Sequence, residues 1–246
     1  MFDERFTEGL DPSVWTPAYL PAWSSRAAAA ATWRVDDDGL HLSIPPDQPL
    51  WCPDDHDPPL RVSAVQSANR SGPVGSTEGQ QPFRAGQTVR EEQPTVLGLT
   101  PGDGTVEVEC RARLGPSAMF SAWMIGLEDA PDRCGEICLV EVFGDTVAGA
   151  HAAVGSGIKA FRDPHLVEDF VVEPRDLDVT GWHTYAAHRR PGSVDLAIDG
   201  VTTRNLRQAP DYPMQLMIAV FDFPDHSAHD PSDVPELVVR RVRYHP

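Results

Sequence analysis

The chain of 246 residues has few positive charges and a single lysine, Lys159: 20 basic residues stand against 37 acidic ones. The resulting formal net charge of −17 makes the chain a poor binder of phosphate backbones, because nucleic-acid affinity comes mainly from neutralising phosphates. Anionic membrane surfaces are disfavoured for the same reason. We therefore expect neither nucleic acid nor a membrane as a partner, whereas a neutral or cationic partner remains open.

Long apolar runs are also missing. No stretch approaches the roughly 18 apolar residues that a spanning helix needs, and the N-terminal sequence MFDERFTEGLD is acidic, without the apolar segment of a secretory signal. The cysteines do not have the C-x-x-C spacing of a zinc or redox centre; they are Cys52, Cys110, Cys134 and Cys138. We expect a cytoplasmic protein with reduced thiols.

Helical periodicity is scarce, and only the alanine run at residues 27–31 favours one or two helical turns. Alternation of apolar and polar residues dominates instead, and one such run ends at Asp199-Gly200, a two-residue hairpin signal. Residues 214–223 are nearly all apolar and predict a strand covered on both faces. Strands are expected in residues 33–44, 105–114, 193–199, 214–223 and 237–242. Many short strands separated by turn signals predict an all-β antiparallel sandwich.

Two segments interrupt this pattern, residues 45–59 and 71–103, which are rich in proline, glycine and polar residues. Neither is long enough for a second core, so we predict one domain over residues 1–246. Long loops in a compact domain usually belong to binding sites. The acidic histidine segment at residues 54–57 lacks a defined metal-ligand spacing, and we interpret it as a solvated loop.

Two glutamates stand in an otherwise apolar strand, GEICLVEVFG, at residues 135–144. A buried carboxylate is costly unless it is paired or hydrogen-bonded. Glu136 and Cys138 share one face of a regular strand, and Glu141 points to the other, because successive side chains alternate. A β-bulge near Leu139-Val140 would return Glu141 to the first face. We therefore predict a bulge there, with the two carboxyls leaning together over a ligand as in a retaining glycosidase; the alternative is an exposed strand with two unrelated glutamates.

This segment resembles the E-x-D-x-x-E signature of glycoside hydrolase family 16, the group of β-glucanases, laminarinases and agarases, with Cys138 in place of the central Asp. Five further segments resemble stretches of that family in the same order along the chain: FDERFTEGLDPSVW, TVEVECRARL, FSAWMIGLED, GWHTYAAHRRPGSVDLAIDGV and VVRRVRYHP. The resemblance implies a concanavalin A-like jelly-roll sandwich. It also implies that Glu136 is the nucleophile and Glu141 the general acid and then base. Cys138 removes the family's proton-sharing partner of the nucleophile, because a thiol is a weak donor and normally neutral.

The resemblance implies roles for three further residues. Trp123 is expected to face the cleft and stack on a sugar, with core packing as the alternative. His151 is expected to hydrogen-bond a sugar hydroxyl near the acid/base, with a purely structural role as the alternative. Arg240 stands where several members of the family have the Asp of a calcium site, so we expect no metal. We find no motif for a cofactor either, and we expect a monomer.

The function that follows is a retaining endo-glycoside hydrolase or transglycosylase that acts on a β-linked polysaccharide. Two other classes stay open. One is a lectin-like carbohydrate-binding protein of the same fold, in which Cys138 has impaired turnover, and the other is an interaction module that binds no sugar. The glycan itself is not named by the sequence, because the two long loops that would select it match no pattern of the family.

Overall fold

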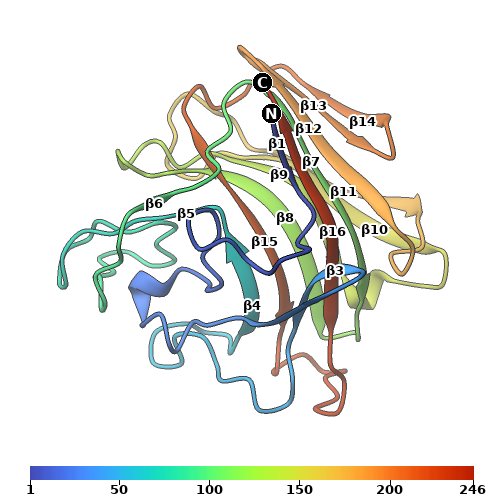
Figure 1. Cartoon of the computed structure of the whole chain (residues 1–246), viewed down its shortest axis with the longest axis horizontal. Helices are drawn as coiled ribbons and strands as arrows, with labels where there is room; N and C mark the ends of the chain where they lie inside the picture. Colours follow the sequence, from blue (N-terminus) through green and yellow to red (C-terminus); the bar gives the residue numbers. More distant parts are fainter.

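The computed structural model describes residues 1–246, in which two antiparallel sheets pack face to face (Figure 1). The first sheet has the order β14 (Val201–Leu206), β13 (Ser193–Ile198), β12 (His183–Arg190), β7 (Gly104–Arg113), β16 (Glu236–His245), β3 (Gly39–Ser43) and β2 (Thr32–Asp36), and β1 (Phe2–Glu4) also pairs with β16. The second has the order β11 (Asp169–Asp176), β10 (His151–Lys159), β9 (Glu136–Phe143), β8 (Ala118–Gly126), β15 (Met214–Asp222) and β4 (Arg61–Gln66). The prediction of an all-β antiparallel sandwich is confirmed.

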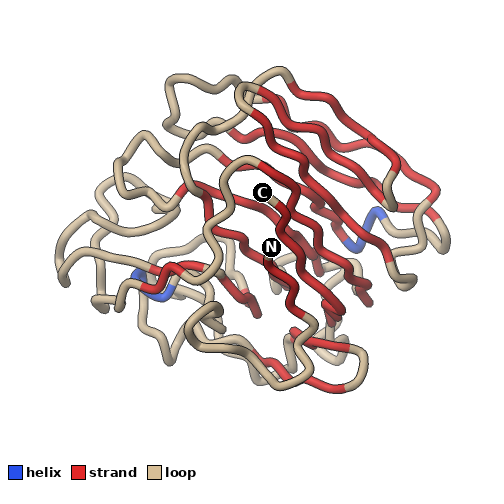
Figure 2. Tube along the Cα trace, turned by 45° about the horizontal axis from the view of Figure 1, so that its top comes forward, coloured by secondary structure: helices blue, strands red, loops and turns tan.

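The remaining elements are short. Strands β5 (Ala68–Asn69) and β6 (Val96–Leu97) form a separate pair, and the 3-10 turns η1 (Pro21–Trp23) and η2 (Gly144–Thr146) are the helical segments. None of these is long and apolar enough to cross a bilayer as a helix. Figure 2 shows the long loops gathered beside the two strand layers, and the chain ends lie together because β1 pairs with β16.

The alternating sequence pattern matches the way the first sheet packs. In β7 the apolar side chains Val106, Val108 and Cys110 lie in the core between the sheets, and the charged residues between them lie on the outer face. The hairpin between β13 and β14 turns at Asp199 and Gly200, whose φ angles of 51° and 76° suit a type I′ turn. Both predictions from alternation are therefore confirmed.

One prediction needs correction. Residues 33–44 form a hairpin rather than one strand: the backbone N–H of Asp38 donates to the side chain of Asp36 at 2.9 Å, and Gly39 has φ 120°, which turns β2 back along β3. The alanine run makes one hydrogen-bonded turn, from the N–H of Ala29 to the carbonyl of Ser25 at 2.9 Å, which is within the one or two turns expected.

Strand β15 is buried on both faces, as predicted for residues 214–223. One face contributes Leu216, Ile218 and Val220 to the core between the sheets. The other face belongs to a second apolar cluster, in which Met217 and Phe221 pack with side chains from the N-terminal segment and the two long loops. These segments therefore cover part of the outer face of the second sheet and leave the rest of it as the floor of a cleft.

Candidate active site

Strand β9 contains the predicted β-bulge. Against β10 it has two residues, Leu139 and Val140, where the partner strand has only Ser156. The register against β8 also shifts at this point. The extra residue turns Glu141 back to the face that Glu136 occupies, and both glutamates line one cleft on the outer face of the second sheet.

Contacts from both neighbouring strands hold the bulge. The hydroxyl of Ser121 on β8 donates a hydrogen bond of 2.8 Å to the carbonyl of Val140. On β10, Gly157 has φ 139°, and a Cβ atom there would lie 2.1 Å from the carbonyl oxygen of Asp169 on β11. The bulge therefore depends on a position that only glycine fits without strain.

We expect Gly157→Ala to lower the free energy of unfolding by about 3 kcal/mol, because the disfavoured backbone conformation and the clash with Asp169 add to each other. Gly149→Ala is the control: its φ of 62° is also positive, but open space surrounds it, so the expected loss is about 1 kcal/mol. Urea unfolding of the two variants measures the difference. Equal losses would mean that β10 moves away from β11 at no cost and that the bulge does not need this glycine.

The glutamate cleft has a volume of about 270 Å³. It is lined by Tyr19, His56, Leu60, Gln81, Met119, Ser121, Trp123, Glu136, Glu141, Lys159, Phe161, Phe221 and Phe223. Aromatic rings thus surround a small number of polar groups, which is the composition expected of a ligand site. The side chain of Glu136 is 7% exposed and that of Glu141 is 16% exposed, so the first glutamate lies deeper.

Lys159 lies between the two carboxylates. It is the cross-strand neighbour of Glu136 at the end of β10. Its Nζ lies 3.2 Å from Oε1 of Glu136 and 3.0 Å from Oε2 of Glu141, so these two oxygens are at most about 6.2 Å apart. That limit includes the separation of roughly 5–5.5 Å typical of retaining glycosidases and is shorter than the roughly 6.5–9.5 Å typical of inverting ones.

Burial and charge act in opposite directions on these groups. Burial raises the pKa of Glu136 to about 7, and the ammonium of Lys159 opposes that rise. Burial also raises the pKa of the Cys138 thiol well above its ordinary value, so Cys138 is neutral. The ammonium of Lys159 is therefore the interaction that favours the ionised form of Glu136.

Trp123 lies where it was expected, in the glutamate cleft. Its ring centroid is 6.2 Å from that of Phe221, and its buried indole N–H has no hydrogen-bond partner in the protein. A ligand in the cleft could accept from that N–H. The neutral Cys138 lies fully buried beneath the cleft, beside Trp123 in the second apolar cluster.

The placement of His151 corrects the sequence prediction. It begins β10, four residues before Gly155, the cross-strand partner of Glu141, and it is not among the residues that line the cleft. Its side chain is 68% exposed and its Nδ1 lies 2.8 Å from a carboxylate oxygen of Asp176. A strand rises about 3.3 Å per residue, so His151 lies roughly 13 Å along β10 from the residue that pairs with Glu141.

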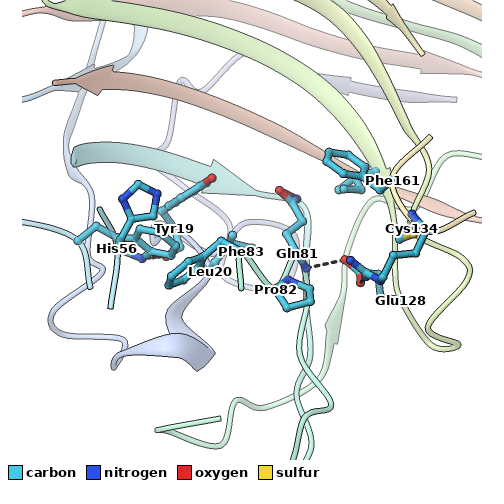
Figure 3. Close-up of a pocket in the computed structure, with 12 residues that line it drawn as sticks. Tyr19, Leu20, His56, Gln81, Pro82, Phe83, Glu128, Cys134 and Phe161 are labelled. Atoms are coloured by element: carbon cyan, nitrogen blue, oxygen red, sulfur yellow. Dashed lines mark hydrogen bonds and ion pairs between the residues drawn. The ribbon is translucent and has the colours of Figure 1, made fainter. Parts of the chain in front are cut away.

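A second cavity of about 170 Å³, here called the aromatic pocket, continues from the glutamate cleft (Figure 3). Tyr19, Gln81, His56 and Phe161 line both spaces. In Figure 3, Gln81 lies between a group of rings on one side and Phe161 with Glu128 and Cys134 on the other. The two spaces therefore form one continuous surface for a ligand longer than one ring.

The rings of the aromatic pocket contact one another closely. The centroid of Trp51 lies 4.9 Å from Tyr19, 4.9 Å from Phe83 and 5.2 Å from His56. The loops that supply them are joined by an ion pair of 2.7 Å between Asp55 and Arg84. Packed rings and ion pairing hold the wall in place before any ligand arrives.

Ten of the thirteen residues that line the cleft were not predicted from the sequence, among them Tyr19, His56, Lys159 and Phe161. His56 was placed in a solvated loop, but its ring enters the cleft, and its Nδ1 lies 2.8 Å from the carbonyl oxygen of Pro58. The sequence did contain one signal for this site, because Lys159 is the only lysine of the chain and ends an apolar strand. Its pairing with Glu136 depends on strand register, which the sequence does not reveal.

Solved structures define the class of this fold. No model of a protein family matches the chain, and no curated protein matches its sequence. The chain is similar to a GlcNAcα1-4Gal-releasing endo-β-galactosidase from Clostridium perfringens, with a TM-score of 0.82, 23% identity and coverage of 99% of this chain. It spans 62% of the length of that enzyme chain.

The chain is also similar to two further structures, which it matches over nearly their whole length. A laminarinase from Flavobacterium sp. UMI-01 has a TM-score of 0.68 at 13% identity, with coverage of 100% of this chain and 99% of its own. A β-glucanase from Bacillus licheniformis has a TM-score of 0.63 at 15% identity, with coverage of 100% and 97%. The chain has the jelly-roll fold of these β-glycan hydrolases, and its resemblance to glycoside hydrolase family 16 is confirmed for the fold.

Proposed function

We propose that this protein is a retaining glycoside hydrolase or transglycosylase that acts on a neutral β-linked glycan. One observation carries the proposal: the bulge in β9 puts Glu136 and Glu141 on the same face of one cleft, close enough for a single ammonium to contact both carboxylates. The fold shared with β-glycan hydrolases supports the same conclusion.

The geometry supports a two-step reaction. In the first step a carboxylate oxygen of Glu136 attacks the anomeric carbon, and Glu141 donates its proton to the departing glycosidic oxygen. In the second step Glu141 takes a proton from a water molecule, or from the hydroxyl of an acceptor sugar, and that oxygen displaces Glu136 from the anomeric carbon. Glu141 is the more exposed of the two glutamates, which leaves it accessible to the incoming water or acceptor sugar.

The charges around the cleft favour an uncharged glycan. Its one cation, Lys159, already faces two carboxylates. In the aromatic pocket Arg162 pairs with the buried carboxylate of Glu128. A sulfated or uronic acid chain would find no free cation there and would meet a chain with a net charge of −17. Neutral sugars can use the aromatic faces instead.

The aromatic pocket accepts the sugar units on the nucleophile side of the bond that is cleaved. Ile125 and Cys134, which line it, lie next to Glu136: Ile125 is its cross-strand partner and Cys134 precedes it by two residues. Glu141 lies farther along β9, toward Met119 and Phe143. The leaving group therefore departs on the Glu141 side, away from the aromatic pocket.

We expect Phe83→Ala to raise KM for an oligosaccharide about tenfold with little change in kcat, because the ring contacts a sugar remote from the reacting bond. Trp33→Ala is the control, since Trp33 is 39% exposed on β2 of the first sheet and lines neither space. Steady-state kinetics on oligosaccharides of increasing length measure both values. If kcat fell and KM stayed the same, the aromatic pocket would not be a glycan subsite.

A lectin-like protein remains the second candidate, and Cys138 favours it because the neutral thiol gives Glu136 no carboxyl partner. Release of reducing ends from a panel of β-glycans separates the two. Turnover that disappears in Glu136→Gln supports the hydrolase, and binding without turnover supports the lectin. If no glycan binds at any concentration, the cleft serves another kind of ligand and both candidates fail.

A further inference from the structure

Lys159 is held by three contacts at the centre of the glutamate cleft. Its ammonium donates to Glu141 at 3.0 Å, lies 3.2 Å from Glu136 and stands 4.6 Å from the ring centroid of Phe170 on β11. The side chain is 24% exposed. An ammonium has three donors in a compact head, so it can contact two carboxylates and a ring face at the same time.

No second cation shares this position. The charged and titratable groups that face Lys159 and Glu136 are Glu141, Cys138, Tyr19 and, farther away, Glu168. His56 lines the same cleft from its loop. Burial keeps the thiol of Cys138 and the phenol of Tyr19 neutral by raising the pKa of each. Lys159 therefore supplies the positive charge that balances the glutamate pair.

We propose that Lys159 is the shared counter-ion of the two glutamates, which stays protonated and pairs with whichever of them carries the negative charge at each stage of the reaction. This inference rests on the proposed function and extends it. Lys159 touches neither bond that changes, so it is a positioning residue that acts through Glu136 and Glu141.

The charge balance of the two steps gives the reason. Before reaction, Glu136 is a carboxylate and Glu141 holds a proton, so the pair carries one negative charge. When Glu136 forms its bond to the anomeric carbon it loses that charge, and Glu141 gains one by giving its proton to the leaving oxygen. The second step reverses both changes. The negative charge thus moves between two oxygens that lie 3.2 Å and 3.0 Å from the same nitrogen, and the ammonium need not leave its place.

Without the ammonium of Lys159 the first step would be slower, because Glu136 would be ionised in a smaller fraction of the protein. Burial already raises the pKa of Glu136 to about 7 against the opposing charge of Lys159. Removing the ammonium removes that opposition, so Glu136 would hold its proton to still higher pH. The nucleophile would then be missing at pH values where the wild-type enzyme works.

Lys159→Met and Lys159→Arg test the inference on the full-length protein. The measurement is kcat/KM for an activated aryl β-glycoside between about pH 5 and 9. For Lys159→Met we expect the acid limb to move up by about one pH unit, with a loss of about tenfold near pH 6 that shrinks at higher pH. Lys159→Arg keeps a cation, so its acid limb should return toward the wild-type position. Phe170→Leu, which keeps every charge, should leave the acid limb in place.

The outcomes separate this inference from the proposed function. A wild-type protein without turnover overturns the proposed function and the counter-ion with it. An active wild type whose Lys159→Met variant loses activity equally at every pH overturns the counter-ion alone and leaves the lysine a structural role. Should Lys159→Met fail to fold by circular dichroism, the neutral and polar Lys159→Gln carries the same test.

Discussion

Glu136→Gln is expected to lose turnover of both a polysaccharide and an activated aryl glycoside, because no covalent glycosyl-enzyme can form without the nucleophile. Glu141→Gln is expected to differ. It should lose polysaccharide turnover, yet keep much of the first step on the aryl glycoside, whose leaving group needs little help from an acid. General acid and base assistance is typically worth about 10²–10⁴-fold, so the two variants should separate clearly.

Pre-steady-state kinetics of the aryl glycoside measure this difference. Glu141→Gln should release a burst of phenol and then lag, since water is no longer activated for the second step. Azide should speed that step by replacing water and should yield a β-glycosyl azide of retained configuration. The reverse asymmetry between the variants would reverse the roles of the two residues. Equal and small losses in both would show that neither is catalytic.

Asp222→Ala is expected to cost about 3–5 kcal/mol of unfolding free energy, because it leaves the largely buried guanidinium of Arg61 without its partner. Asp222 is 3% exposed and accepts from Nε of Arg61 at 2.9 Å and from the hydroxyl of Ser117 at 2.8 Å. The pair joins the end of β15 to β4 beside Phe221 and Phe223 of the cleft. Activity should therefore fall together with stability.

Calorimetry and urea unfolding measure this loss, which corresponds to roughly 6–20 °C in Tm for a chain of this size. Asp129→Ala is the matched control, since its 3.0 Å pair with Arg133 is half exposed on both sides and is expected to contribute at most about 1 kcal/mol. Similar losses in the two variants would mean that water reaches Arg61 once Asp222 is gone, so the pair would not anchor this edge of the cleft.

Sequence periodicity was sufficient to predict the strands in which apolar and polar residues alternate. The alternation in residues 105–114 predicted β7 because one face of that strand packs in the core and the other meets solvent. The parity of Glu136, Cys138 and Glu141 predicted the bulge for a similar reason: a buried carboxylate must find a partner, and only an extra residue brings Glu141 to the same face.

Contacts between segments that lie far apart in the sequence could not be predicted from periodicity. The aromatic pocket joins Tyr19, Trp51 and Phe83, which come from segments with no strand periodicity. Lys159 meets Glu136 only through the register of β10 against β9. His151 shows the converse error, because a position carried over from a family motif does not fix how far along a strand the residue lies from the site.

Release of new reducing ends from a panel of neutral β-glycans, by the wild-type protein and by Glu136→Gln prepared in parallel, tests the central claim most directly. The panel should include laminarin, lichenan and xyloglucan, with the sulfated carrageenan and porphyran as the charged comparison. The account predicts that the wild type releases reducing ends from at least one neutral glycan and that Glu136→Gln releases none. Equal release by both proteins, or no release from any glycan that the wild type demonstrably binds, would contradict it.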